Sequence, residues 1–179
     1  MNTMANGLTY KRVIPSPGIM KQFAATLASH LRPNDVIVLT GDLGAGKTQF
    51  VQGVADGLGI RAQVTSPTFN ILLAYNGGRL PLFHFDLYRL ENESELADIG
   101  FDETLESDGV SFIEWGNKFP GALPYSYLHI HIVDEGDGVR TVYAHALGDS
   151  CRQLLFLWAK DSKARLSKTS FASIPGVVW

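Results

Sequence analysis

The chain has 179 residues, of which 45% are hydrophobic and 18% charged, and its formal net charge at pH 7 is −3. This length suits one domain with a real core, and the composition excludes an intrinsically disordered chain and a generic polyanion-binding surface. The single cysteine, Cys151, excludes an internal disulfide and a thiolate metal cage, and no apolar run approaches the ~20 residues of a membrane-spanning helix. Because a secretion signal is also missing at the N-terminus, we expect a cytoplasmic protein that contacts no membrane and meets nucleic acid only through partner proteins.

Charge divides the chain into two parts. Residues 1–149 contain ten Lys and Arg against seventeen Asp and Glu, whereas residues 150–179 contain five basic residues against one acidic residue. We expect a main domain over 1–149 and a basic C-terminal extension over 150–179. An apolar, helix-like stretch over 152–160 is followed by a segment, 162–173, that is typical of a solvated or partly ordered tail. A basic tail is also able to contact RNA or an acidic neighbour.

Residues 8–58 are predicted to form a strand, a helix, a second strand and a second helix. Residues 8–14 are strand-like, and the pair Ser16-Pro17 is a typical helix start. Apolar residues at helical spacing continue this helix until Pro33 ends it. The apolar run 36–39 predicts a strand that is buried on both faces, as in a largely parallel sheet, and a second helix follows over 48–58.

A hairpin and an acidic segment come next. Residues 71–75 and 80–85 flank the turn signal Asn76-Gly77-Gly78, which predicts two antiparallel strands. Residues 91–108 contain eight acidic side chains and no basic one, in two short helical segments broken at Gly100. Such a run is either a solvated surface or a docking surface for a basic partner.

Three more strands complete the predicted elements. Residues 110–113 form a short apolar run of the buried type, and residues 127–133 and 139–145 alternate between apolar and polar side chains. The turn signal Glu135-Gly136-Asp137-Gly138 joins the last two into a β-hairpin. Strands that alternate with helices in this way predict an α/β fold.

Residues 41–48 match the phosphate-binding pattern G-x-x-x-x-G-K-[ST], between a buried strand and a helix, as the mechanism requires. Backbone N–H groups of the loop and the helix N-terminus are suited to surround phosphate oxygens. Lys47 is placed to reach the β- and γ-phosphates, and the Thr48 hydroxyl is the expected ligand of Mg²⁺. We therefore expect a P-loop NTPase-like three-layer fold, with a mixed, largely parallel central sheet and an antiparallel C-terminal hairpin. The expected nucleotide-binding residues are Gly41, Asp42, Leu43, Gly44, Ala45, Gly46, Lys47 and Thr48.

Two carboxylates follow predicted strands and qualify for chemistry at the phosphates. Asp86 follows residues 80–85, and Glu114 follows residues 110–113. Ligands of open α/β sheets collect outside the carboxyl ends of the strands, so both acids are candidate Mg²⁺ ligands beside Thr48. Glu114 suits a general base and Asp86 a ligand of the metal or its water, although the spacing leaves their division open. The alternatives are a turn or helix-cap role for Asp86 and a surface role for Glu114.

Three further features near these motifs have two readings each. The hydroxyls of Thr65, Ser66 and Thr68 form either a switch-like loop that responds to the γ-phosphate or a plain turn. Arg89 either neutralises charge during phosphate transfer or forms a surface ion pair. Trp115 either packs near the nucleotide or is a buried aromatic after a strand.

Four segments, in this order along the chain, resemble the bacterial TsaE family, formerly called YjeE. They are residues 41–48, residues 65–68, His84-Phe85-Asp86-Leu87-Tyr88-Arg89 and Ile113-Glu114-Trp115. The resemblance spans residues 10–148, and its last two motifs are far more specific than the phosphate loop alone.

This resemblance implies a small P-loop ATPase that works with the proteins TsaB and TsaD in forming threonylcarbamoyladenosine next to the anticodon of tRNA. It implies hydrolysis of ATP to ADP and phosphate, which resets the assembly between turnovers. On the matching positions, Lys47 and Thr48 belong to the phosphate loop, Asp86 is the acid on the Mg²⁺ side, and Glu114 is the acid tied to hydrolysis. Family members commonly end near Gly148, so the resemblance says nothing about the residues that follow.

Other functions have weaker support in the sequence. A small-molecule or nucleotide kinase usually has an arginine-bearing lid, and here the arginines are scattered singly. A GTPase would need the guanine-binding pattern N-K-x-D. Here Asn117-Lys118-Phe119 is followed by Pro120 in place of the Asp. A metal site at His129, His131 and His145 lacks a carboxylate or cysteine at ligand spacing. A nucleotide-gated adaptor with negligible hydrolysis overlaps with the leading interpretation.

Overall fold

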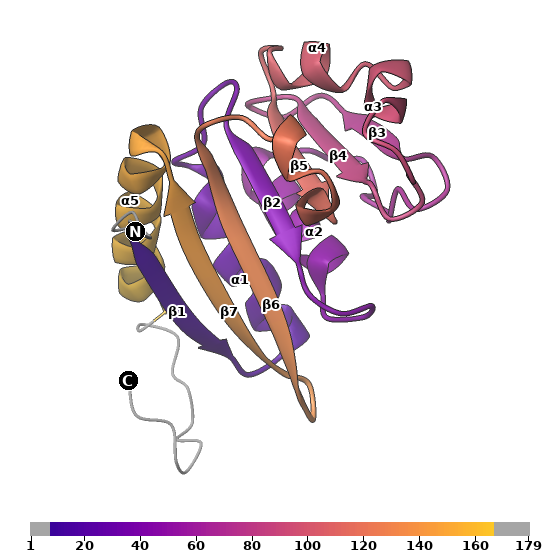
Figure 1. The fold of residues 1–179 in the computed structure, drawn as a ribbon. Coiled ribbons are helices and arrows are strands. Elements are labelled where there is room, and N and C mark those ends of the chain that lie inside the picture. The colour runs from indigo at the N-terminus through magenta and orange to yellow at the C-terminus, as the bar shows by residue number, and fades with distance from the viewer. Residues whose placement is uncertain (1–7, 167–179) are drawn as a thin grey trace, which may run out of the picture.

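The structure is a computed structural model, which describes residues 8–166 of the chain (Figure 1). One seven-stranded sheet has the strand order β1-β7-β6-β2-β5-β4-β3. The strands are β1 (Thr9–Ile14), β2 (Val36–Thr40), β3 (Leu72–Tyr75), β4 (Leu82–Asp86), β5 (Val110–Glu114), β6 (Tyr127–Gly136) and β7 (Val139–Leu147). The central strands β6, β2, β5 and β4 are parallel, while β1, β7 and β3 pair antiparallel. This mixed sheet, with its antiparallel β6–β7 hairpin, confirms the predicted α/β fold class.

Helices cover the sheet on both faces. Three longer helices, α1 (Pro17–Ala28), α2 (Lys47–Leu58) and α5 (Asp149–Leu166), share one large apolar core with one face, and α1 and α2 lie behind the sheet in Figure 1. The short elements α3 (Glu95–Asp98), α4 (Phe101–Leu105), η1 (Gly116–Lys118) and η2 (Pro120–Ala122) lie around a smaller core on the other face. Within residues 8–166, no helix is both long and apolar enough to cross a membrane.

The start of α1 is as predicted, but its end is not. The Ser16 side chain accepts a hydrogen bond from the Ile19 amide at 3.3 Å, and Pro17 occupies the first turn. The helix ends at Ala28, well before Pro33. Arg79, from the loop before β4, donates to the carbonyl oxygens of Ala28 and Leu31 at 2.5 and 2.9 Å. These bonds satisfy carbonyls at the helix end, so the chain leaves the helix although Leu31 is still buried.

Helix α5 is longer than the predicted 152–160 and belongs to the main core. Trp158 is fully buried, and its indole N–H donates to the Thr26 hydroxyl on α1 at 3.0 Å. Ser162 is also fully buried, and its hydroxyl lies 3.2 Å from the Tyr10 hydroxyl on β1. The prediction of a solvated tail from 162 onward is therefore wrong as far as Leu166, because these side chains pack onto α1 and β1. The rest of that segment, 167–173, lies outside the described residues.

Close packing of α1 against α2 places the start of α2 over the sheet. A Cβ at Gly53 on α2 would lie 2.5 Å from the Lys21 carbonyl oxygen and 2.9 Å from the Ala24 Cβ. Only glycine permits this approach, since such distances are far shorter than van der Waals contact. The N-terminus of α2 is thereby held beside the carboxyl ends of β2 and β5.

Candidate nucleotide and magnesium site

The loop between β2 and α2 has a backbone that its glycines make possible. Gly41 has φ +139°, and a Cβ there would lie 2.3 Å from the carbonyl oxygen of Ile132 on β6. Gly46, with φ +110°, is the N-cap residue directly before α2. The loop is closed by a hydrogen bond from the Ala45 amide to the Asp42 carbonyl at 3.0 Å. Strand, loop and helix thus follow one another as the phosphate-binding pattern predicts.

The Lys47 side chain is turned back onto this loop. Its ammonium donates to the carbonyl oxygens of Gly41 and Asp42 at 2.9 and 3.1 Å, and the residue is only 5% exposed. The same ammonium lies 5.0 Å from the centre of the Trp115 ring, within the range of a cation–π contact. A buried ammonium held by backbone carbonyl oxygens of the loop over residues 41–48 fits an anionic ligand, because phosphate oxygens are stronger acceptors than neutral carbonyls.

The two acids lie side by side at the ends of β4 and β5. Asp86 and Glu114 are partners in the parallel pairing of β4 with β5, and each is 4% exposed. Glu114 Oε1 accepts a hydrogen bond from the Thr48 hydroxyl at 3.2 Å and lies 2.9 Å from His84 Nε2. The structure therefore brings the predicted residues Thr48, Asp86 and Glu114 together, with the Glu114 carboxylate within hydrogen-bond distance of the Thr48 hydroxyl.

Asp86 is hydrogen-bonded to a different part of the site. Its Oδ2 accepts from the Thr68 hydroxyl at 2.8 Å, and its Oδ1 accepts from the Tyr88 amide at 3.0 Å. The Ser66 and Thr68 hydroxyls are 2.7 Å apart, which gives a chain of polar contacts from Ser66 to Asp86. The polar loop is thus attached to the site through Thr68, while the Thr65 amide donates to the Tyr75 hydroxyl at 3.1 Å.

Backbone strain marks the end of this polar loop. Ile71 has φ +64°, a left-handed conformation that costs a β-branched residue on the order of 1–3 kcal/mol. The Ile71 carbonyl accepts from the Asp86 amide at 2.8 Å, so the strained residue contacts the acid's own backbone. Trp115, directly after Glu114, is also left-handed, with φ +62°. Non-glycine outliers of this kind cluster at functional sites.

Two cations of the predicted motifs stabilise loops near the site. The Arg89 guanidinium lies over the Phe69 ring, 4.3 Å from its centre, which ties the segment after Asp86 to the polar loop. Lys118 donates to the Tyr88 and Leu90 carbonyl oxygens at 2.6 and 2.5 Å. In this fold Lys118 is therefore a structural residue in the segment that resembles a guanine-binding motif.

The histidines of the second hairpin form hydrogen bonds within the sheet. The Thr40 hydroxyl lies 2.8 Å from His129 Nε2 and 2.9 Å from His131 Nδ1. His145 is the partner of His129 across β6 and β7. Burial lowers the pKa of His129, and the nearby His131 and His145 add to this effect. In the described part of the chain, no group of three or more His, Cys, Asp or Glu side chains is arranged to hold a metal ion.

Two residues of the site had no predicted role. His84 lies two positions before Asp86 on β4, and strand alternation alone places both on one face, so this signal was available. Arg140 on β7 donates to the Ala45 carbonyl at 3.0 Å and pairs with Asp134 at 2.7 Å. It thereby connects the loop over residues 41–48 to the β6–β7 hairpin. No local pattern indicates this contact, because it depends on the strand order.

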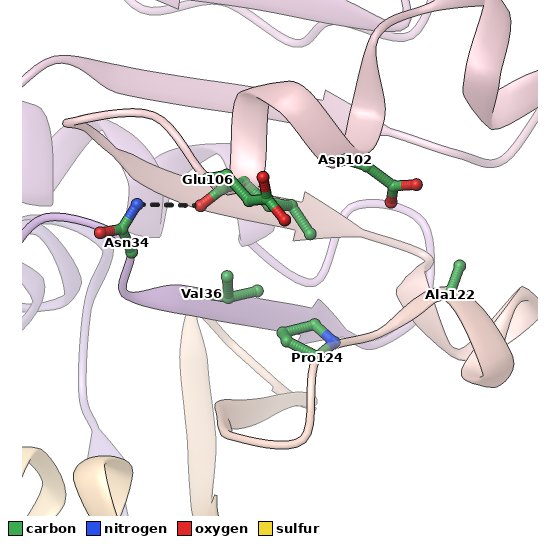
Figure 2. Close-up of a pocket in the computed structure, with 7 residues that line it drawn as sticks. Asn34, Val36, Asp102, Glu106, Ala122 and Pro124 are labelled. Carbon is green, nitrogen blue, oxygen red and sulfur yellow. Dashed lines mark hydrogen bonds between the residues drawn. The ribbon is translucent and has the colours of Figure 1, made fainter.

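A pocket of about 540 Å³ lies at the opposite end of β2 from the phosphate loop (Figure 2). Asn34 donates to the Leu105 and Ser107 carbonyl oxygens at 3.3 and 2.6 Å and so attaches α4 to the start of β2. Two exposed acids of the predicted acidic segment lie at this pocket. Its lining residues are Asn34, Val36, Asp102, Leu105, Glu106, Ala122 and Pro124.

Comparisons with known proteins give a consistent result. The model of the family "Threonylcarbamoyl adenosine biosynthesis protein TsaE" matches residues 14–142, which include every residue of the candidate site. A Bacillus subtilis protein named tRNA threonylcarbamoyladenosine biosynthesis protein TsaE is 45% identical over 139 residues, covering 78% of this chain and 87% of the relative. A protein of the same name from Treponema pallidum is 45% identical over 112 residues, covering 63% and 82%. A crystal structure of Bacillus subtilis YdiB is similar with a TM-score of 0.77 at 35% identity, covering 87% of this chain and 97% of that one.

Proposed function

The chain belongs to the TsaE family of tRNA threonylcarbamoyladenosine biosynthesis, and on this premise we propose that it is a cytoplasmic Mg²⁺-dependent ATPase that serves that pathway. The observation that supports this proposal best is the hydrogen bond of 3.2 Å from the Thr48 hydroxyl to Glu114. It joins the first turn of the phosphate-loop helix to an acid at the end of the neighbouring strand. An ATPase needs a hydroxyl and a carboxylate together at this place.

The phosphate chain of ATP would be held by the loop over residues 41–48. Its backbone N–H groups and the N-terminus of α2 supply positive partial charge without any side chain. In the proposed complex, the Lys47 ammonium exchanges its two carbonyl partners for oxygens of the β- and γ-phosphates. This exchange is favourable because charge-assisted hydrogen bonds to phosphate are stronger than those to neutral carbonyls.

Thr48, Asp86 and Glu114 are the residues that would hold Mg²⁺. The metal, when bound, neutralises charge on the phosphates and orients them. The Thr48 hydroxyl donates its proton to Glu114, which leaves its lone pairs free to act as a ligand. Both hydrogen bonds to Glu114 converge on Oε1, so Oε2 is the oxygen available to accept a proton from an attacking water.

We assign two roles to Asp86: it holds Mg²⁺ or a water bound to it, and it contacts the polar loop. Its hydrogen bond from Thr68 connects the acid to a segment with hydroxyls suited to respond to a γ-phosphate. This arrangement supports the switch-like interpretation of the loop that ends at Thr68. Loss of the Thr68 hydroxyl should weaken hydrolysis more than nucleotide binding.

The proposed partners are TsaB and TsaD, with tRNA reached through the complex that they form. Two surfaces are candidates for docking: the acidic segment 91–108, whose Asp102 and Glu106 are exposed at the pocket in Figure 2, and the basic C-terminal part. Charge reversal at Asp102 and Glu103 tests the first surface, because neither side chain is in a hydrogen bond or ion pair in the described structure that the change would break. Unchanged partner affinity at low salt would exclude that surface.

The decisive experiment measures ATP turnover by the purified chain, first alone and then with TsaB and TsaD from the same organism. We expect slow release of phosphate by the chain alone and stimulation by the partners. Phosphate transfer to a small metabolite would instead indicate a kinase. Nucleotide binding with no hydrolysis under either condition would indicate a nucleotide-gated adaptor.

A further inference from the structure

A buried histidine contacts the proposed hydrolytic acid. His84 lies in the middle of β4, flanked by Leu73 on β3 and Phe112 on β5, and none of its surface is exposed. Its Nε2 is 2.9 Å from Glu114 Oε1, the same oxygen that accepts from Thr48. Histidine is an uncommon residue at a fully buried strand position, where aliphatic residues are found more often.

The other ring nitrogen determines which protonation state fits this environment. His84 Nδ1 is buried and has no hydrogen-bond partner among residues 8–166. An imidazolium, or a neutral ring protonated at Nδ1, would bury an N–H donor with no protein acceptor. The tautomer protonated at Nε2 leaves only a lone pair at Nδ1 and donates its one proton to Glu114. The geometry therefore favours Nε2 as the donor and Glu114 Oε1 as the acceptor of this hydrogen bond.

Such a donor has a specific effect on the carboxylate. The terminal torsion of a glutamate side chain is broad, so its two oxygens exchange places readily unless they are held. Donors from Thr48 and His84 hold Oε1 in place, whereas among residues 8–166 no hydrogen bond holds Oε2.

We propose that His84 is a positioning residue for hydrolysis: it orients Glu114 through the Nε2–Oε1 hydrogen bond and does not itself contact nucleotide. This inference rests on the proposed ATPase activity. His84 and Asp86, both on β4, then have separate roles. Asp86 is oriented by the polar loop and the Tyr88 amide, whereas His84 orients Glu114 on the neighbouring strand β5 from within the sheet.

The test uses four variants beside the wild type, each assayed as the full chain together with TsaB and TsaD. They are His84→Leu, which keeps apolar volume, His84→Gln, which restores an N–H donor near the position of Nε2, Glu114→Gln, and the double variant of His84→Leu with Glu114→Gln. We expect His84→Leu to lower kcat by about 10- to 100-fold with KM for ATP within about twofold, as for other residues that orient a site acid. We expect His84→Gln to recover most of kcat. We also expect the double variant to have the same kcat as Glu114→Gln alone.

The outcomes distinguish the inference from the function on which it rests. If the wild-type complex binds ATP and releases no phosphate, the ATPase proposal fails and this inference fails with it. If the wild type is active and His84→Leu has an unchanged kcat, or loses activity additively with Glu114→Gln, only the role of His84 is refuted.

A second measurement does not depend on the variants folding. Two-bond proton–nitrogen correlation spectra of the wild-type chain report the tautomer of each histidine. The inference requires that His84 carries a proton at Nε2. A ring with its proton at Nδ1 alone would overturn it.

Discussion

Replacement of Trp158 by alanine tests whether the C-terminal helix is an integral part of this protein. The indole is fully buried between α5, α1 and α2, with its ring 4.7 Å from that of Phe23 and 6.0 Å from that of Phe50. The ring of Tyr10 on β1 lies 6.1 Å away on another side. The indole N–H also donates to the Thr26 hydroxyl, which itself donates to the Phe23 carbonyl at 2.6 Å.

The expected loss follows from these contacts. Truncation of a buried Trp costs about 3–5 kcal/mol, and each aromatic pair contributes about 0.5–1.5 kcal/mol beyond area burial. With three aromatic neighbours, we expect Trp158→Ala to lie at the upper end, near 5 kcal/mol. That is a large part of the ~5–15 kcal/mol that stabilises a typical domain. Trp158→Phe keeps a ring but loses the hydrogen bond to Thr26, and should cost about 1–3 kcal/mol.

Urea unfolding followed by far-ultraviolet circular dichroism measures both free energies of unfolding. The same helix offers a matched control in Phe156, an aromatic residue that is 61% exposed, where alanine should change stability by less than about 0.5 kcal/mol. The m-value should stay constant if the changes act on the folded state. A loss below about 1 kcal/mol for Trp158→Ala would refute the assignment of α5 to the core.

Three further predictions concern the nucleotide site and the pH dependence of stability. Lys47→Ala should abolish binding of a fluorescent ATP analogue, whereas Glu114→Ala should retain binding and lose phosphate release; equal losses of affinity would contradict the role of Glu114. Gly41→Ala should weaken nucleotide binding more than tenfold, because its Cβ would collide with the Ile132 carbonyl, and titration of the analogue with unchanged affinity would disprove this. Burial acts to raise the pKa of Asp161, but hydrogen bonds and charge from Arg165 and His30 outweigh it and hold the pKa below the ordinary 3.8. Its stabilising contribution is thus present above that value and lost as the pH falls through the lowered pKa, so wild type and Asp161→Asn should differ in unfolding free energy near pH 6, and this difference should shrink as the pH falls through the lowered pKa. A difference that stays the same size across an acid titration would argue against this ion pair.

Most of the elements were predictable because their signals are local. The apolar run 36–39, the glycine pattern that follows it and the turn at 76–78 each specify local backbone geometry without reference to the rest of the chain. The ends of helices were less predictable where a distant residue decides them. Arg79 donates to the carbonyl oxygens of Ala28 and Leu31, at and just beyond the end of α1, and no pattern within the helix predicts this contact.

The candidate site shows the same division. Thr48 and Glu114 were predicted to meet because the carboxyl ends of parallel strands share one edge of a sheet. The hydrogen bond from Arg140 to the phosphate loop was not predictable, since it requires β6 to lie between β7 and β2. Strand alternation could have predicted that His84 lies on the same face of β4 as Asp86. Its partner Glu114 is on another strand, however, and only the pairing of β4 with β5 brings the two together.

The two hydrogen bonds of Lys118 have a mechanical consequence. Asp86 and Glu114 end neighbouring strands, and Lys118, four positions after Glu114, is anchored on the carbonyl oxygens of Tyr88 and Leu90, just after Asp86. One ammonium thus connects the segments that leave the two strands, so a displacement of either segment would disturb the surroundings of both acids together.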